Sequence, residues 1–360
     1  MITVKHLSNT ISCLHYLLII LVVIIHSRFY NSEMACEDFH AAFPVASSTS
    51  TILSSVIAQS AVPAFFLISG FLFFGMQNTF TKEDYLKKIK KRISSLVIPY
   101  VLWNCIYILY LVVAVDDLFF GGGKFLDYSI GDWLWCFWDK SHVQGSEQCP
   151  IYIYMWFLRD LFVACLISPL IYFLFKIKLL PYVSGLLFVI WLATNDLHFF
   201  ALSLCSFCFF SIGAMLSLYK YNIARFPRYS LIILGIVYSA ILTILTMTIC
   251  EVGQKVILQN ICTSVGIIFI LGIVSLLVEK GCIRPCRLLV SSAFFIYLSH
   301  GILVGYVRHA RKLLPQTDLF LTIGYIVTPL ISIVILLAIF KIMSSLTPRL
   351  LGILTGGRSQ

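Results

Sequence analysis

Two histidines lie near the ends of the first long apolar run of the chain, residues 14–30, which reads LHYLLIILVVIIHSRFY. Ionisable side chains inside an apolar helix are costly and tend to mark function. His15 and His26 are eleven residues apart, close to three full helical turns, so both rings project from one face of a helix. At about 1.5 Å per residue they are separated by roughly 16 Å along the helix axis. The spacing predicts a helix face that presents two titratable groups at two depths.

Each of these rings could instead have a purely structural role. A lone histidine in an apolar helix is more often a buried ring with a satisfied hydrogen bond than a catalytic group. Two histidines on one face weaken that alternative.

Arg159 and Asp160 lie inside another apolar run, within YMWFLRDLFVACLISPLI (154–171). Adjacent helical residues point about 100° apart, so we expect that these two do not simply neutralise each other. Arg159 must then find an anion, a carbonyl group or a water-filled cavity; the alternative is a structural ion pair with another helix. Trp156, about one turn away, is placed to form the floor of a sugar or acyl site.

Two further segments carry polar groups in apolar surroundings. His300 lies midway along AFFIYLSHGILV (293–304), with Tyr297 one turn earlier on the same side. Ser69 precedes a glycine in VPAFFLISGFLFF (62–74), where small residues favour close packing of helices. The three histidines have no ligand-type partner at i, i+4, and Cys282 and Cys286 have no matching His or Cys pair nearby, so the sequence predicts no metal site.

The elements that must hold these residues are membrane helices. Of the 360 residues 60% are hydrophobic and 12% charged, whereas soluble domains carry about 25% charged residues. Apolar stretches near the ~20 residues needed to cross a bilayer recur along the chain. We predict an all-α polytopic membrane protein, a single domain over residues 1–360. Its ten expected spans are 11–27, 51–76, 95–115, 152–175, 179–195, 199–218, 229–250, 257–278, 289–307 and 318–345.

Basic clusters predict the orientation of these spans. The densest cluster, KEDYLKKIKKR (82–92), is expected in the cytoplasm by the positive-inside rule, which also places both termini there. Residues 28–50 and 116–150 then form extracytoplasmic loops. The net charge of +10 is explained by these topology signals, so no nucleic acid partner is expected. One basic loop, VRHARKLLPQ (307–316), falls on the outer side against the rule.

Three cysteines, Cys36, Cys136 and Cys149, fall in the expected outer loops. Two of them could pair if that compartment is oxidising, since disulfides persist outside the cytosol. The alternative is three unpaired thiols.

Six segments, taken in order, resemble the acyltransferase-3 family of integral-membrane O-acetyltransferases, which modify bacterial surface polysaccharides. The segments are LLIILVVIIHS, VPAFFLISGFLF, RISSLVIPYVLW (92–103), MWFLRDL (155–161), FFSIGAML (209–216) and FFIYLSHG (294–301). Each is weak alone, but their order covers most of the chain.

The resemblance implies transfer of an acetyl group from cytoplasmic acetyl-CoA to a hydroxyl of a cell-surface or lipid-linked saccharide, at the bacterial inner membrane. The family's critical histidine falls on His26, and Ser69 and His300 are carried over with their motifs. The family's arginine, eleven residues before that histidine, is His15 here. Arginine is charged at any physiological pH, whereas a histidine is only partly charged near neutrality, so His15 would hold an anionic part of the donor more weakly.

O-acylation needs a base for the acceptor hydroxyl and a group that stabilises the oxyanion. His26 is expected to be the base, or a nucleophile that carries the acyl group covalently; both roles remain open at this point. Arg159 is the candidate for the oxyanion. Binding residues for donor and substrate are expected at Arg92, Lys88, Lys91, Ser69, Trp156, His300 and Arg28. Arg92 with the two lysines suits the phosphates of coenzyme A, although topology alone explains that cluster equally well.

Two rival functions use the same residues. A transporter or flippase for a lipid-linked saccharide would line its path with these charges, although the sequence has neither the inverted repeats nor the paired broken helices typical of transporters. A weakened acyltransferase is the second rival, because His15 replaces the arginine. Membrane lipids and the saccharide are the expected partners, and nothing in the sequence indicates a partner protein.

Overall fold

The computed structural model describes residues 4–29, 36–76, 79–113, 128–145, 147–195, 197–247, 255–313 and 315–357. Within these ranges the chain is helical almost throughout, and its strands form one short antiparallel hairpin, β1 (His198–Phe199) with β2 (Leu202–Ser203). This confirms the all-α fold class.

The first half of the chain builds α1 to α9 with short π and 3₁₀ turns between them. These elements are α1 (Val4–His26), α2 (Cys36–Ala42), α3 (Pro44–Ser50), η1 (Thr51–Ile57), η2 (Ala58–Ser60), α4 (Ala61–Phe74), α5 (Lys82–Arg92), η3 (Ile93–Val97), α6 (Ile98–Val113), α7 (Ile130–Trp138), α8 (Ser141–Gln144), η5 (Ile153–Met155) and α9 (Trp156–Leu166). The remainder forms α10 (Ser168–Lys176), α11 (Leu180–Ala193), α12 (Leu204–Leu218), α13 (Arg228–Met247), α14 (Lys255–Glu279), α15 (Arg287–Ala310), η6 (Arg311–Leu313), α16 (Asp318–Leu346) and α17 (Pro348–Leu354).

Seven helices within the described ranges are long and apolar enough to cross a membrane, and the bent pair α9–α10 makes an eighth if it is one span. The bend of 45° falls just before Pro169, whose ring cannot continue the helix N-terminal to it. Two shorter apolar helices, α11 and α12, lie at the predicted fifth and sixth spans. A helix therefore occupies each predicted span, while the count of ten crossings and the side on which the termini lie stay predictions.

The basic segment 82–92, expected as a loop between spans, is a helix that continues into α6. Thr81 begins it with a capping box: its hydroxyl accepts from the Asp84 amide at 3.2 Å, and the Asp84 carboxylate accepts from the Thr81 amide at 3.1 Å. The sequence signal that predicts this helix start is the Thr and Asp pair three residues apart, which an analysis of apolar runs does not detect. The expected outer loops likewise contain the helices α2, α3, α7 and α8, although 30–35 and 114–127 lie outside the described residues.

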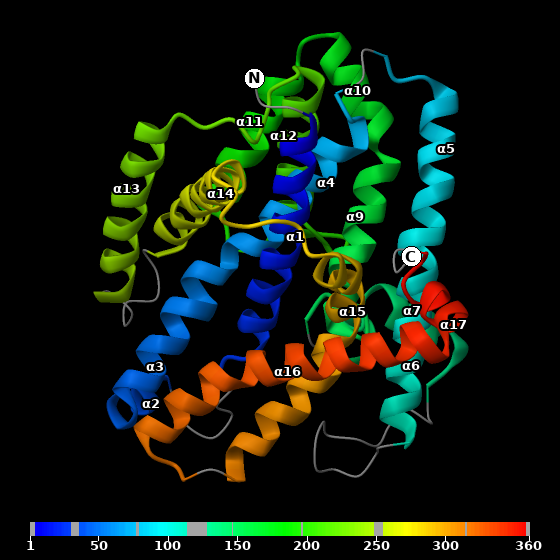
Figure 1. Ribbon diagram of the computed structural model, residues 1–360. Coiled ribbons are helices and arrows are strands. Elements are labelled where there is room, and N and C mark those ends of the chain that lie inside the picture. The colour runs from blue at the N-terminus through cyan, green and yellow to red at the C-terminus, as the bar shows by residue number, and fades with distance from the viewer. Residues whose placement is uncertain are drawn as a thin grey trace.

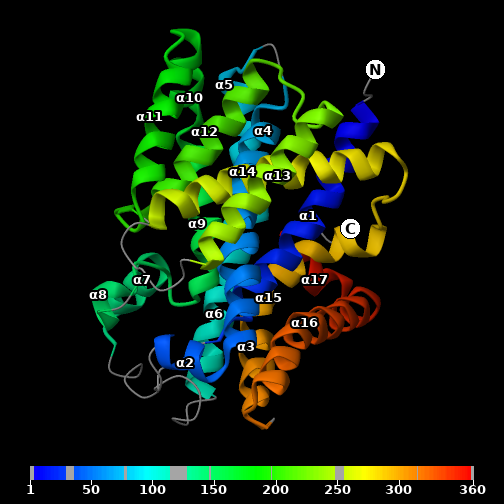
Figure 2. The same cartoon turned by 90° about the vertical axis from the view of Figure 1, so that its left-hand side faces the viewer.

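Helix α1 runs through the middle of the bundle and contacts α4, α14, α15 and α16 (Figures 1 and 2). The side chains of Leu14, Leu18 and Val22 on α1 are buried and belong to the main hydrophobic core. The helix that carries both predicted catalytic histidines is thus held by elements from both halves of the chain.

Helices α4 and α12 pack against each other through two glycines. A Cβ atom on Gly70 would lie 2.1 Å from the Phe210 carbonyl oxygen, and one on Gly213 would lie 1.9 Å from the Leu67 carbonyl oxygen. The two backbones touch where each helix lacks a side chain, which confirms the close packing predicted for the Ser69-Gly70 pair.

The segment after α7 folds back on that helix, with the Ile151 amide donating to the Cys136 carbonyl at 2.7 Å. Cys136 and Cys149 are both buried free thiols, so the suggested disulfide between these two is absent from the structure, and the Cys36 side chain lies outside the described residues. Burial raises the pKa of each thiol to about 11, which keeps both protonated at neutral pH.

Candidate active site

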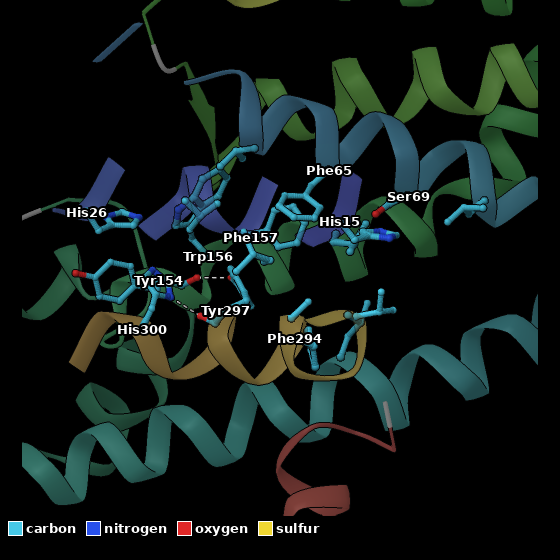
Figure 3. A pocket seen from close by; sticks show the side chains of 18 of the residues that line it. His15, His26, Phe65, Ser69, Tyr154, Trp156, Phe157, Phe294, Tyr297 and His300 are labelled. Atoms are coloured by element: carbon cyan, nitrogen blue, oxygen red, sulfur yellow. Dashed lines mark hydrogen bonds between the residues drawn. The ribbon is translucent and has the colours of Figure 1, made fainter. Parts of the chain in front are cut away.

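A single cavity of about 280 Å³ gathers six of the residues predicted from the sequence (Figure 3). Its walls come from α1, α4, α5, η3, η5, α9 and α15, which meet around one side of α1. The six predicted residues that line it are His15, His26, Ser69, Arg92, Trp156 and His300.

One stripe of α1 forms a wall of this pocket. His15, Ile19, Val22 and His26 all line it, at the i, i+4, i+7, i+11 spacing of a single helix face. The prediction that the two histidines share a face is therefore confirmed. An apolar stretch of helix separates the two rings, so the pocket has two polar ends joined by a hydrophobic middle.

The His26 end of the pocket is a cluster of three rings. His26 meets Tyr154 edge to face, with centroids 4.5 Å apart, and the His300 ring lies 5.2 Å from His26 and 4.8 Å from Tyr154. In Figure 3 these three labelled side chains group together at one end, away from His15 and Ser69. Two imidazoles thus face the same small volume.

His300 presents a defined nitrogen to this volume. Its Nδ1 lies 2.5 Å from the Tyr297 carbonyl oxygen, and since a carbonyl only accepts, Nδ1 carries the proton. In the neutral ring Nε2 is then left with a lone pair, and it is buried without a hydrogen-bond partner among the described residues. A buried acceptor that lines a pocket is suited to a hydroxyl group of a ligand.

Tyr154 was not singled out by the sequence reasoning, although it lies in the segment quoted for Arg159. Its ring sits against Gly301, where a Cβ atom would come within 2.1 Å of the ring edge. The Tyr297 hydroxyl donates to the Tyr154 carbonyl at 2.5 Å, and the Tyr152 hydroxyl donates to the Leu298 carbonyl at 3.0 Å. The only available signal was the bare glycine after His300, which leaves room for an aromatic ring from another helix.

At the opposite end His15 stacks on Phe65, with centroids 5.9 Å apart. Ser69 lies at the same end (Figure 3), and Arg92 is the one member of the predicted basic cluster that lines the pocket. Lys88 donates to the Phe73 carbonyl at 2.5 Å, at the end of α4, and Lys91 is exposed. This end therefore combines a titratable ring and a hydroxyl, and the pocket also has a guanidinium in its lining.

Arg159 lies outside the residues that line the pocket. Its Nε donates to Asp160 Oδ1 at 3.0 Å, and its Nη atoms donate to the carbonyl oxygens of Trp138 and Ala201. Asp160 Oδ2 also accepts from the Ser203 amide at 2.8 Å. The expectation that the adjacent pair would not neutralise each other is wrong, because the long arginine side chain folds back onto its neighbour, and the pair ties α9 to α7 and to the β-hairpin.

Arg28 is likewise absent from the pocket lining, and its carbonyl oxygen accepts from Arg311 at 3.4 Å. Within the part of the chain that the structure describes, no three His, Cys, Asp or Glu side chains gather as a metal site.

Comparison with known proteins gives matches over nearly the whole chain. Residues 9–340 match the family model described as Acyltransferase domain. The "Succinoglycan biosynthesis protein ExoH" of Rhizobium meliloti (strain 1021) is 25% identical over 364 residues, an alignment that covers 98% of this chain and 93% of that protein. No solved structure matches.

Proposed function

Since the chain belongs to the acyltransferase-3 family and is a multi-pass membrane acyltransferase, we propose that it transfers an acetyl group from acetyl-CoA to a hydroxyl group of a cell-surface or lipid-linked saccharide. The observation that carries this proposal is the pocket that joins His15 at one end to His26 and His300 at the other and has Arg92 in its lining. The similarity to a protein named for succinoglycan biosynthesis supports a saccharide acceptor. We place the enzyme in the bacterial inner membrane.

The His26 end suits the transfer step. His26 takes the proton of the acceptor hydroxyl as the oxygen attacks the thioester carbonyl carbon. The carbon–sulfur bond then breaks, and the coenzyme A thiolate leaves with the proton that His26 had taken. His300 Nε2 accepts a hydrogen bond from a second hydroxyl of the acceptor, which requires an acceptor rich in hydroxyl groups, as a saccharide is.

The His15 end suits the donor. A cavity of about 280 Å³ is near the lower limit of ~300 Å³ for ligand pockets, so it accommodates an acylated pantetheine arm and leaves the nucleotide outside. Arg92 at the pocket and Lys91 on the exposed side of the same helix are placed to bind the phosphates. Lys88 contributes chiefly by holding the end of α4.

Arg159 is reassigned from oxyanion contact to positioning. Its guanidinium is engaged by a carboxylate and two carbonyl groups, and it is buried away from the pocket. We propose that it fixes the start of α9, from which Trp156 and Phe157 line the pocket. The flippase alternative is disfavoured by family membership, whereas the weakened-acyltransferase alternative remains to be tested through His15.

The test is acetyl transfer by the purified protein in lipid nanodiscs, with radiolabelled acetyl-CoA and the native host's surface glycan as acceptor. We expect the wild type to add acetyl groups and His26→Ala to lose activity by about 100-fold or more, the usual range for a general base. His142→Gln is the matched control, because that histidine is exposed and outside the pocket. His15→Arg is expected to lower the KM for acetyl-CoA.

Three outcomes would contradict the proposal. A folded wild type that leaves the native glycan unacetylated, with acetylation unchanged in a deletion strain, would remove the saccharide acetylation. Full activity in His26→Ala would remove the assigned base. Activity that appears only in His15→Arg would show that the natural chain is a weakened relative.

A further inference from the structure

The end of helix α1, where His26 lies, is held by side chains from two other parts of the chain. The last carbonyl groups of a helix have no partner within it, so each needs one from elsewhere. The Ser27 hydroxyl donates to the Val23 carbonyl at 2.7 Å, and the Ser54 hydroxyl donates to the Ile24 carbonyl at 2.6 Å. Beyond the helix, Arg311 Nη1 donates to the Ser27 carbonyl at 2.9 Å.

Arg311 is buried, with 7% of its surface exposed, although it comes from the basic loop that contradicts the positive-inside rule. Its second Nη reaches the Arg28 carbonyl at 3.4 Å, and the guanidinium carbon lies 4.7 Å from the centroid of the Phe29 ring. These contacts account for one basic residue of the discordant loop: Arg311 binds the end of α1 rather than the membrane surface.

The position of Arg311 connects the two helices that carry the imidazoles. Arg311 lies in η6, directly after α15 and eleven residues after His300. Its guanidinium donates a hydrogen bond to the carbonyl group of Ser27, the residue after His26. The His26 and His300 rings are 5.2 Å apart. A rotation or slide of the α1 end relative to α15 would change this separation, and Arg311 opposes both motions because it binds two successive carbonyl groups.

We propose that Arg311 is a positioning residue that holds His26 opposite His300. This inference rests on the proposed function, in which His26 is the base. Arginine is required because its planar fork binds two carbonyl groups in a fixed geometry, whereas a lysine offers one flexible ammonium group. The guanidinium touches neither substrate, since Arg311 is not among the residues that line the pocket.

The experiment compares Arg311→Ala and Arg311→Lys with the wild type in nanodiscs, with Lys312→Ala as the matched control from the exposed side of the same turn. We expect Arg311→Ala to lower kcat for acetyl transfer by about 100-fold with an unchanged KM for acetyl-CoA, since a misplacement near 1 Å has costs of that order. Arg311→Lys is expected to retain an intermediate kcat. Added guanidinium ion should restore part of the activity of Arg311→Ala and none of His26→Ala.

A second measurement does not depend on catalysis. Diethyl pyrocarbonate acylates accessible imidazoles, and the rate at His26 is followed by peptide mass spectrometry. Release of the α1 end is expected to speed modification of His26 in Arg311→Ala and to leave it unchanged in Lys312→Ala.

The inference is overturned if Arg311→Ala retains the wild-type kcat, or if its loss of activity follows loss of folded protein and guanidinium ion restores nothing. Should Arg311→Ala fail to accumulate, Arg311→Lys decides: wild-type kcat and an unchanged His26 modification rate would contradict a need for the fork. An inactive wild type whose His26 modification still depends on Arg311 would refute the proposed function and leave the positioning role intact.

Discussion

The two nitrogens of His300 have separate tasks, and this separation can be tested one nitrogen at a time. Nδ1 donates to the Tyr297 carbonyl, while Nε2 is the buried acceptor at the pocket. An asparagine amide can replace Nδ1, and the longer glutamine amide reaches the position of Nε2.

His300→Asn is therefore expected to keep the wild-type thermal stability while the KM for the saccharide rises roughly two- to twelvefold, the cost of one net hydrogen bond. His300→Gln is expected to behave in the opposite way, with a KM nearer to that of the wild type and a lower melting temperature, because it loses the bond to Tyr297. Initial rates at varied saccharide concentration and thermal unfolding in nanodiscs measure both effects. An unchanged KM in His300→Asn would mean that Nε2 does not contact the acceptor.

For individual residues, the sequence predicted members of the pocket correctly where the period of a single α-helix was enough to place them on one face. The His15 and His26 pair required only the turn of an α-helix, and both line the pocket. Tyr154 could not be found in this way, because it precedes α9 in a 3₁₀ turn and is seated by a glycine from α15. The sequence could not reveal the partners of Arg159, so it predicted this residue as a member of the site. Those partners are carbonyl groups of α7 and the β-hairpin, which only the tertiary structure brings close to the guanidinium.

Among the elements, α4 and α12 are joined where no side chain can be added. The atoms that a new Cβ at Gly70 or Gly213 would meet are carbonyl oxygens of the facing backbone, which cannot move aside as a flexible side chain can. Since α4 also contributes Phe65 and Ser69 to the pocket, the separation of these two helices sets one wall of the site.

Gly213→Ala is accordingly expected to destabilise the protein by about 3 kcal/mol, at the upper end of ordinary overpacking, with a lower yield of folded protein. Gly185→Ala in α11 is the control, because nothing lies within 4 Å of its added Cβ and alanine favours a helix. Thermal unfolding followed by size-exclusion chromatography compares the two. Equal stability of the two variants would contradict the close backbone contact.

At this scale hydropathy located the helices well, since a helix occupies each predicted span, but it could not assign the polar segments between them. The helix over 82–92 is stabilised by a cap at Thr81 rather than by an apolar stripe, so an apolar-run criterion overlooks it. The basic residues near 307–316 contradict the positive-inside rule in the predicted orientation, and one of them, Arg311, is buried against the end of α1.

For the whole molecule, the proposed reaction requires one orientation in the membrane. Coenzyme A thioesters are cytoplasmic, so the pocket end with His15 must open to the cytoplasm and the His26 end must face the opposite side. The side of the membrane that each end faces is predicted only from the basic clusters. Cys282 and Cys286 can test this prediction, because both are exposed in the connection between α14 and α15, a segment predicted to be cytoplasmic.

A membrane-impermeant maleimide added to intact cells is therefore expected to leave Cys282 and Cys286 unlabelled, and added to inverted membrane vesicles to label both, as read by peptide mass spectrometry. The double variant Cys282→Ser/Cys286→Ser identifies the signal, and the buried Cys136 and Cys149 are expected to react from neither side because their raised pKa and burial suppress the thiolate. Labelling of Cys282 in intact cells would show that the orientation is the reverse of the predicted one, with the His15 end on the outer side. A cytoplasmic thioester could not reach the donor end in that orientation, so this one result would refute acetyl-CoA as the donor whatever the state of His26.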